Sequence, residues 1–93
     1  MAVTKNYLKA AHPNTKEITL RALISDQDSK IRRRVALNPK APHEVLRTLA
    51  SDPDPEVRIA LAGNPLTPET ILEQLASDES VYVRFGLACE RTL

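Results

Sequence analysis

Few residues in this chain could carry out chemistry, and they do not combine into an active site. The 93 residues include one cysteine, Cys89, and two histidines, His12 and His43. This is a poor ligand set for zinc or an iron–sulfur cluster, and no histidine can be assigned to activate the thiol as a nucleophile. The sequence therefore predicts no metal, no cofactor and no catalytic residue.

Carboxylates are more numerous, but most occupy positions that helix caps and turns use. Seven of the twelve lie in the expected caps and turns: Asp26, Asp28, Asp52, Asp54, Glu56, Asp78 and Glu79. No two of them stand out as a general acid and base. The chain has only two glycines, which excludes a glycine-rich phosphate loop. We therefore expect that the protein is not an enzyme.

One pattern of charged residues is periodic, because an aspartate is followed six residues later by an arginine three times. The aspartates are Asp26, Asp52 and Asp78, and the arginines are Arg32, Arg58 and Arg84. Each acid is expected in a turn and each base on the following helix. We predict that they form a structural ladder of charge-assisted hydrogen bonds between the turns of adjacent repeats. In the alternative interpretation, the three arginines line a binding groove.

These pairs belong to a repeat of 26 residues. The copies are HPNTKEITLRALISDQDSKIRRRVAL, NPKAPHEVLRTLASDPDPEVRIALAG and NPLTPETILEQLASDESVYVRFGLAC. Seven positions are identical in all three copies, and twelve are identical in the last two. Such a period is typical of a solenoid, in which each unit buries its apolar face against its neighbours. We expect residues 1–93 to form one domain, with a half-repeat cap (1–11), three repeats (12–37, 38–63, 64–89) and a tail (90–93).

Each copy is expected to form two short helices. In the second copy, Pro42 suits the first turn of the first helix. Four apolar residues share one face of this helix and should form the core: Val45, Leu46, Leu49 and Ala50. Because Pro53 disfavours helical geometry at the residue before it, the helix should stop near Ser51 and Asp52.

The second helix of this copy has a complete set of start and stop signals. Asp54 is the expected N-cap residue, and Pro55 suits the first helical position. The expected inner face consists of Val57, Ala60 and Leu61. Gly63 and Asn64 should end the helix, with Pro65 preventing its continuation. Residues 3–11 are interpreted as a degenerate second helix that caps the repeats, with Tyr7, Leu8 and Ala11 facing inward.

The pattern NPxxPxxVLxxLASDPDPEVRxALAxNP resembles the leucine-rich repeat variant family and, more distantly, HEAT repeats. The resemblance covers residues 12–89 and is most specific over 38–65. It implies an all-α fold, a right-handed α–α superhelix of the armadillo or HEAT solenoid type with short α or 3₁₀ helices, and a role in macromolecular association. The family's founding example also holds an iron–sulfur cluster with a group of cysteines, but Cys89 alone does not match that motif.

The net charge of +1 conceals an asymmetry. Residues 1–47 carry ten Lys or Arg and four Asp or Glu (+6), whereas residues 48–93 carry three and eight (−5). A basic end and an acidic end could support salt-sensitive, head-to-tail self-association. The start of the chain shows no signal peptide, and no segment is long and apolar enough to span a membrane, so we expect a soluble cytoplasmic protein.

The basic residues gather in SKIRRRVALNPK, residues 29–40. The candidate interaction surface comprises Lys30, Arg33, Arg34 and Lys40, together with Ile59 as an exposed residue of a second helix. It could bind an acidic protein or nucleic acid, or be merely solvated, and the chain has few aromatic side chains to stack on bases. The last unit, around Phe85, Leu87 and Leu93, is a further candidate contact site. We expect a protein-interaction scaffold, with a nucleic-acid-binding accessory protein as the alternative.

Overall fold

The computed structural model describes residues 4–91, and this part of the chain contains seven short α-helices and no β-strand. The helices are α1 (Lys5–Ala11), α2 (Glu17–Leu23), α3 (Ser29–Leu37), α4 (His43–Leu49), α5 (Pro55–Gly63), α6 (Glu69–Ala76) and α7 (Val81–Arg91). The all-α prediction is confirmed. Within the described range every helix is α-helical and none is 3₁₀. Leu93 lies outside this range.

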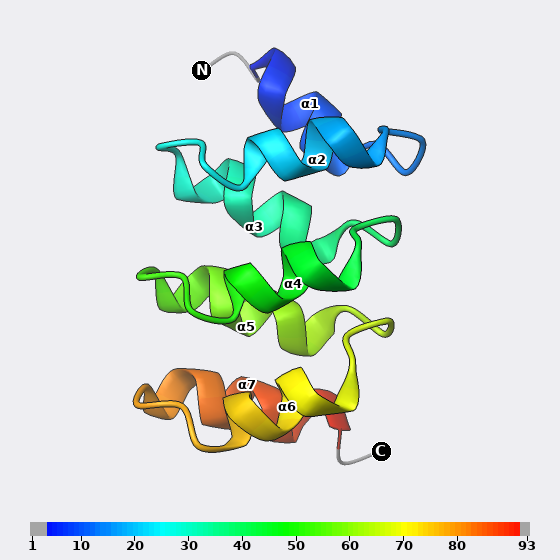
Figure 1. Cartoon of the computed structure of the whole chain (residues 1–93). Helices are drawn as coiled ribbons and strands as arrows, with labels where there is room; N and C mark the ends of the chain where they lie inside the picture. Colours follow the sequence, from blue (N-terminus) through cyan, green and yellow to red (C-terminus); the bar gives the residue numbers. More distant parts are fainter. Residues whose placement is uncertain (1–3, 92–93) are drawn as a thin grey trace.

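The helices are arranged in two rows (Figure 1). The second helices of the repeats pack on one another in chain order, α1 on α3, α3 on α5 and α5 on α7. The first helices α2, α4 and α6 lie in front of them in the view of Figure 1, so that α1 and α7 occupy opposite ends of the molecule. The molecule measures 34 × 25 × 22 Å. Each helix pair therefore contacts mainly the pairs before and after it.

The second helices start where their local sequence predicts. The side chain of Asp54 accepts a hydrogen bond from the backbone N–H of Glu56 at 2.9 Å, and Pro55 is the first residue of α5. Asp28 caps α3 in the same way, accepting from the N–H of Lys30 at 2.9 Å. An aspartate here satisfies a backbone donor that has no partner within the helix, and its charge interacts favourably with the helix dipole.

The first helices begin one residue later than expected. Pro42 is the N-cap residue of α4, with an extended backbone, and Pro68 has the same role before α6. Neither proline can cap with its side chain, but each fixes the φ angle at the point where the chain enters the helix. The predicted inner residues of this helix are all buried: Val45, Leu46, Leu49 and Ala50.

Within residues 4–91, the second helices do not end at a glycine in the left-handed conformation, which is the usual role of glycine at a helix end. Gly63 is the last residue of α5, and no residue in the described range, glycine included, has a positive φ angle. The helix ends because Asn64 adopts an extended backbone conformation and Pro65 follows it.

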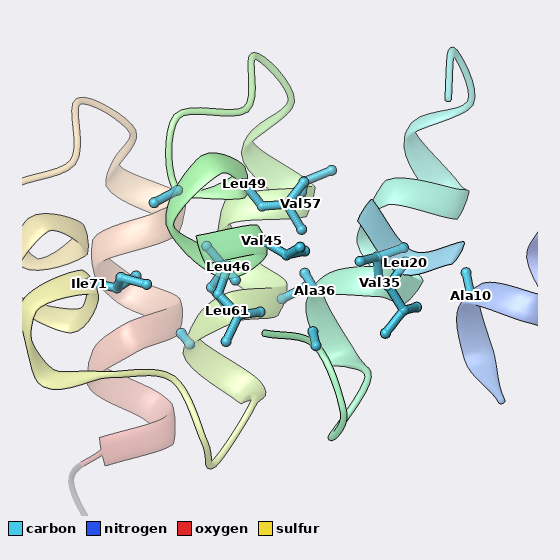
Figure 2. Packing of buried hydrophobic residues seen from close by; sticks show 14 of the residues in the cluster. Ala10, Leu20, Val35, Ala36, Val45, Leu46, Leu49, Val57, Leu61 and Ile71 are labelled. Carbon is cyan, nitrogen blue, oxygen red and sulfur yellow. The ribbon is translucent and has the colours of Figure 1, made fainter. Parts of the chain in front are cut away.

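The core runs through the repeats as one cluster of small aliphatic side chains (Figure 2). It includes Val57, Ala60 and Leu61 on the inner face of α5, as predicted. On α1, however, Ala10 is the buried residue, whereas Leu8 is 59% exposed. The expectation that Leu8 faces inward is therefore wrong. At the corresponding positions, Arg34 of α3 lies over the Tyr7 ring of α1 and Ala60 of α5 is buried, whereas within residues 4–91 no helix precedes α1.

Candidate functional site

The aspartates and arginines of the sequence repeat meet across the joints between consecutive repeats. Arg32 donates from Nε to Oδ2 of Asp52 at 2.7 Å and from Nη2 to Oδ1 at 3.2 Å. Arg58 makes the same pair of bonds with Asp78, at 2.9 and 3.2 Å. Both are two-pronged pairings of a planar guanidinium with a carboxylate, the geometry that favours arginine over lysine.

Each arginine also contacts the turn of its own repeat. Arg32 donates from Nη1 to the backbone carbonyl of Asp26 at 2.7 Å, and Arg58 donates to that of Asp52 at 2.5 Å. One guanidinium therefore joins two turns. The side chains of Arg58 and Asp78 are each 8% exposed, so this pair is enclosed by protein. Arg32 and Arg58 therefore hold the joints together, and each also lines a surface hollow beside its aspartate, so the binding groove stays an alternative interpretation.

The ends of the ladder differ from its middle. Asn6, one period before Arg32, donates from Nδ2 to Oδ2 of Asp26 at 3.1 Å and so replaces the arginine at the first joint. At the other end, Arg84 donates from Nη1 to the carbonyl of Asp78 at 2.5 Å. No carboxylate within residues 4–91 forms an ion pair with Arg84. Arg84, the last arginine of the ladder, therefore binds the turn of its own repeat but no carboxylate within residues 4–91.

A second ladder, formed by asparagines, was not predicted. The side-chain nitrogen of Asn38 donates to the carbonyls of Ala10 and His12, at 2.8 and 2.9 Å, and that of Asn64 donates to the carbonyls of Ala36 and Asn38, at 2.9 and 3.3 Å. Both asparagines are buried. Each therefore ties the end of one second helix to the end of the second helix before it.

The asparagines also organise their own turns. Oδ1 of Asn38 accepts from the N–H of Lys40 at 2.8 Å, and Oδ1 of Asn64 accepts from that of Leu66 at 2.9 Å. At the equivalent position of the first copy, Nδ1 of His12 accepts from the N–H of Asn14 at 3.0 Å. His12 thus reproduces the local bond, as expected for a residue at a helix stop. The recurrence of asparagine in two of three copies was the available signal for this ladder.

Three charged groups in the joints, caps and first helices have shifted pKa values. The hydrogen bond that Arg32 donates to Asp52 raises the pKa of the Arg32 guanidinium, and the one that Arg21 donates to Glu44 raises the pKa of Arg21. The backbone N–H of Glu56 is the main cause of a lowered pKa at Asp54, assisted by the Ser29 hydroxyl and by the charges of Arg32 and Arg58. These groups all remain charged near neutral pH, which keeps the caps and joints intact.

The four basic residues of the candidate interaction surface differ in exposure. Lys30 and Arg33 are exposed on α3, whereas Lys40 follows the C-terminal end of that helix and lines a surface hollow with Lys16. Arg34 is half-buried, with its guanidinium carbon 5.5 Å from the centroid of the Tyr7 ring. Its Nε atom is buried and has no hydrogen-bond partner. Arg34 is therefore packed on α1 by a cation–π contact rather than extended towards solvent.

Ile59 is not the exposed contact residue that the sequence suggested. It is half-buried and packs on the core. A Cβ atom placed on Gly86 would lie 3.3 Å from Cγ2 of Ile59, so α7 presses closely on this side chain. Ile59 belongs to the packing between α5 and α7. The spacing along α5 alone could not reveal this, because the covering residue is 27 positions further along the chain.

The described residues show no group of three histidine, cysteine or acidic side chains that could hold a metal ion. Cys89 is exposed on α7, and His12 and His43 are exposed on other repeats. The part of the chain in residues 4–91 also contains no helix long and apolar enough to cross a membrane. Four of the five buried polar or charged residues in the described range belong to the two ladders: Asn38, Asn64, Asp52 and Arg58.

The repeated helix pairs and their ladders define an all-α helical repeat protein. The sequence pattern of the Leucine Rich Repeat Variant domain matches residues 4–65, which is more than half of the chain. The chain therefore belongs to the Leucine Rich Repeat Variant family. No curated protein and no solved structure matches the chain significantly.

Proposed function

We propose that this chain is a non-catalytic scaffold for protein–protein interaction in the cytoplasm. In this proposal the stacked helix pairs form a right-handed, HEAT-like solenoid. The main support is that the periodic polar residues act between repeats. Arg32, Arg58, Asn38 and Asn64 are engaged in inter-repeat hydrogen bonds, so the repeated sequence builds a scaffold rather than a reaction site.

The exposed surface supports a protein partner more than a nucleic acid. Three large apolar side chains are exposed on α7, namely Val81, Tyr82 and Phe85. Grouped apolar residues on a surface are typical of protein contacts. Of the four basic residues, Lys30, Arg33 and Lys40 are exposed, whereas Arg34 is half-buried and packed on Tyr7. The exposed basic side chains carry the alternative proposal of a nucleic-acid-binding accessory protein.

The test is an affinity capture from native cytoplasm, with and without nuclease, followed by identification of the retained material. The bait is the full chain, compared with a Lys30→Glu/Arg33→Glu variant that leaves the Arg34–Tyr7 contact in place. We expect a defined protein that survives nuclease treatment. Material that is lost both with nuclease and in the variant would replace this proposal by the nucleic-acid alternative. A mass that rises with concentration and falls with salt would instead identify a second copy as the partner.

A further inference from the structure

Two joints between repeats are complete inside the molecule. The α7 end of the molecule presents one half of a third joint of the same kind. At each internal joint, an arginine of one second helix reaches an aspartate in the next turn, 20 residues further along the chain. The pairs are Arg32 with Asp52 and Arg58 with Asp78. Arg84 is the next arginine of this series, and its carboxylate partner is missing from residues 4–91.

The guanidinium of Arg84 is already held in place for such a partner. Its Nη1 donates to the carbonyl of Asp78, as Nη1 of Arg58 does to the carbonyl of Asp52. At the internal joints, the two donors that bind the next turn are Nε and Nη2. In Arg84 these donors form no hydrogen bond with the described residues, and the side chain is exposed. The joint therefore offers an oriented pair of donors to a carboxylate.

The apolar part of the joint is also present and uncovered. Phe85 is 68% exposed, and it lies one period after Ile59, which packs against Gly86 of the next second helix. Ala88 is exposed, whereas the equivalent alanines Ala36 and Ala62 are buried. Arg84, Phe85 and Ala88 thus correspond to Arg58, Ile59 and Ala62, which are buried or half-buried in the preceding repeat.

We infer that this face of α7, defined by Arg84, Phe85 and Ala88, binds a helix–turn–helix unit of another protein that carries an aspartate in its turn. The carboxylate binds Nε and Nη2 of Arg84, and a small side chain on the partner's second helix accommodates Phe85. This inference rests on the proposed scaffold function and specifies the class of partner. The chemistry of this partner is inferred from the two internal joints, where the equivalent surfaces of the earlier second helices are covered by the next helix pair.

The face can be tested by adding the unit that it is inferred to bind. One extra copy of residues 64–89 is inserted between Cys89 and Glu90 of the full chain, which places a copied aspartate 20 residues after Arg84 and a copied glycine against Phe85. We expect hydrogen-exchange protection of the inserted helices. We also expect Arg84→Gln to lower Tm by at least about 4 °C more in the extended chain than in the original chain, as for loss of a buried charged hydrogen bond.

A double-mutant cycle makes this result specific. Replacing the copied aspartate by asparagine should give a similar loss in the extended chain, and combining it with Arg84→Gln should add little further loss. Arg33→Gln, which changes an exposed arginine away from the joint, is the matched control and should have the same small effect in both chains. Equal effects of Arg84→Gln in the two chains, or an unprotected insertion, would overturn the inference.

The same face is then examined in the capture experiment with the Arg84→Gln/Phe85→Ser bait. Both residues are exposed, so we expect the bait to remain folded while the nuclease-resistant partner is lost. If that partner is retained by this bait, the inference is wrong while the scaffold function stands. If the original chain captures no nuclease-resistant protein at all, the scaffold function fails, and the extended chain still decides what the face can bind.

Discussion

Arg58 and Asp78 are joined by two hydrogen bonds, at 2.9 and 3.2 Å, across the joint between the second and third repeats. Both side chains are 8% exposed. A buried ion pair of this kind is weak evidence of net stabilisation, because removing two charges from water opposes their attraction. Its geometric effect is clearer, since Arg58 also binds the carbonyl of Asp52 and so fixes the distance between consecutive turns.

Breaking this pair by removing one partner should be strongly destabilising. We expect Asp78→Ala to lower the free energy of unfolding by about 3 kcal/mol, because it leaves the Arg58 guanidinium buried without its carboxylate. Urea unfolding followed by circular dichroism measures the change. The control is Glu44→Ala, which removes an exposed ion pair with Arg21 and should cost much less. Equal losses in the two variants would show that the joint is held by apolar packing alone.

Asn64 provides a test of the second ladder. We expect Asn64→Ala to lower the free energy of unfolding by about 2 kcal/mol or more, because it leaves the carbonyls of Ala36 and Asn38 without this donor. Asn64→Asp is the sharper variant, since it keeps the acceptor for the N–H of Leu66 but removes the donor. Its expected loss in urea unfolding is at least as large. A stable Asn64→Asp protein would contradict a structural role for the side-chain nitrogen.

Features that depend on neighbouring residues in the sequence were predictable. Asp54, Pro55 and the inner face of α5 lie where expected, because capping and helical periodicity act over a few residues. The aspartate and arginine positions could also be found, since they are identical in all three copies. The asparagine ladder was not predictable from identity across the copies, because His12 replaces the asparagine in the first copy and only two copies share it.

Features that depend on packing between repeats were not predictable from one copy. The exposure of Leu8 follows from the absence of a helix before α1 in the described chain, and the burial of Ile59 follows from the glycine that faces it on α7. The position of the Arg34 side chain likewise depends on Tyr7, which lies 27 residues earlier in the chain. Each case involves two residues on different helices, which periodicity within a helix cannot relate.

Arg34 occupies a position where the other copies have Ala60 and Gly86, and its buried Nε has no partner. We expect Arg34→Met to preserve or increase stability, by up to about 1 kcal/mol, because it keeps an apolar chain on Tyr7 and removes the unsatisfied donor. Thermal and urea unfolding measure this effect. Arg34→Glu is the matched variant and should destabilise, since it places a carboxylate near the negative face of the Tyr7 ring and leaves a shorter apolar chain there. A clear loss of stability in Arg34→Met would show that this contact outweighs the cost of burying Nε.

Asp54 should make stability depend on pH in the acid range. Its pKa is lowered from 3.8 in the folded protein, chiefly by the hydrogen bond from the N–H of Glu56. The unfolded chain therefore takes up a proton at this residue at a higher pH than the folded chain does. The stabilisation is complete above the unfolded-state pKa and is lost as the pH falls from about 4 through the folded-state pKa.

The variant that isolates this effect is Asp54→Asn, because asparagine caps helices about as well as aspartate but does not titrate in this range. Urea unfolding at pH values from about 7 down to about 2 should show wild type losing more stability than Asp54→Asn as the pH falls below about 4. The other carboxylates titrate in both proteins, so the difference between the two curves reports Asp54 alone. Parallel curves would mean that the Asp54 charge interacts no better with the folded cap and with Arg32 and Arg58 than with water.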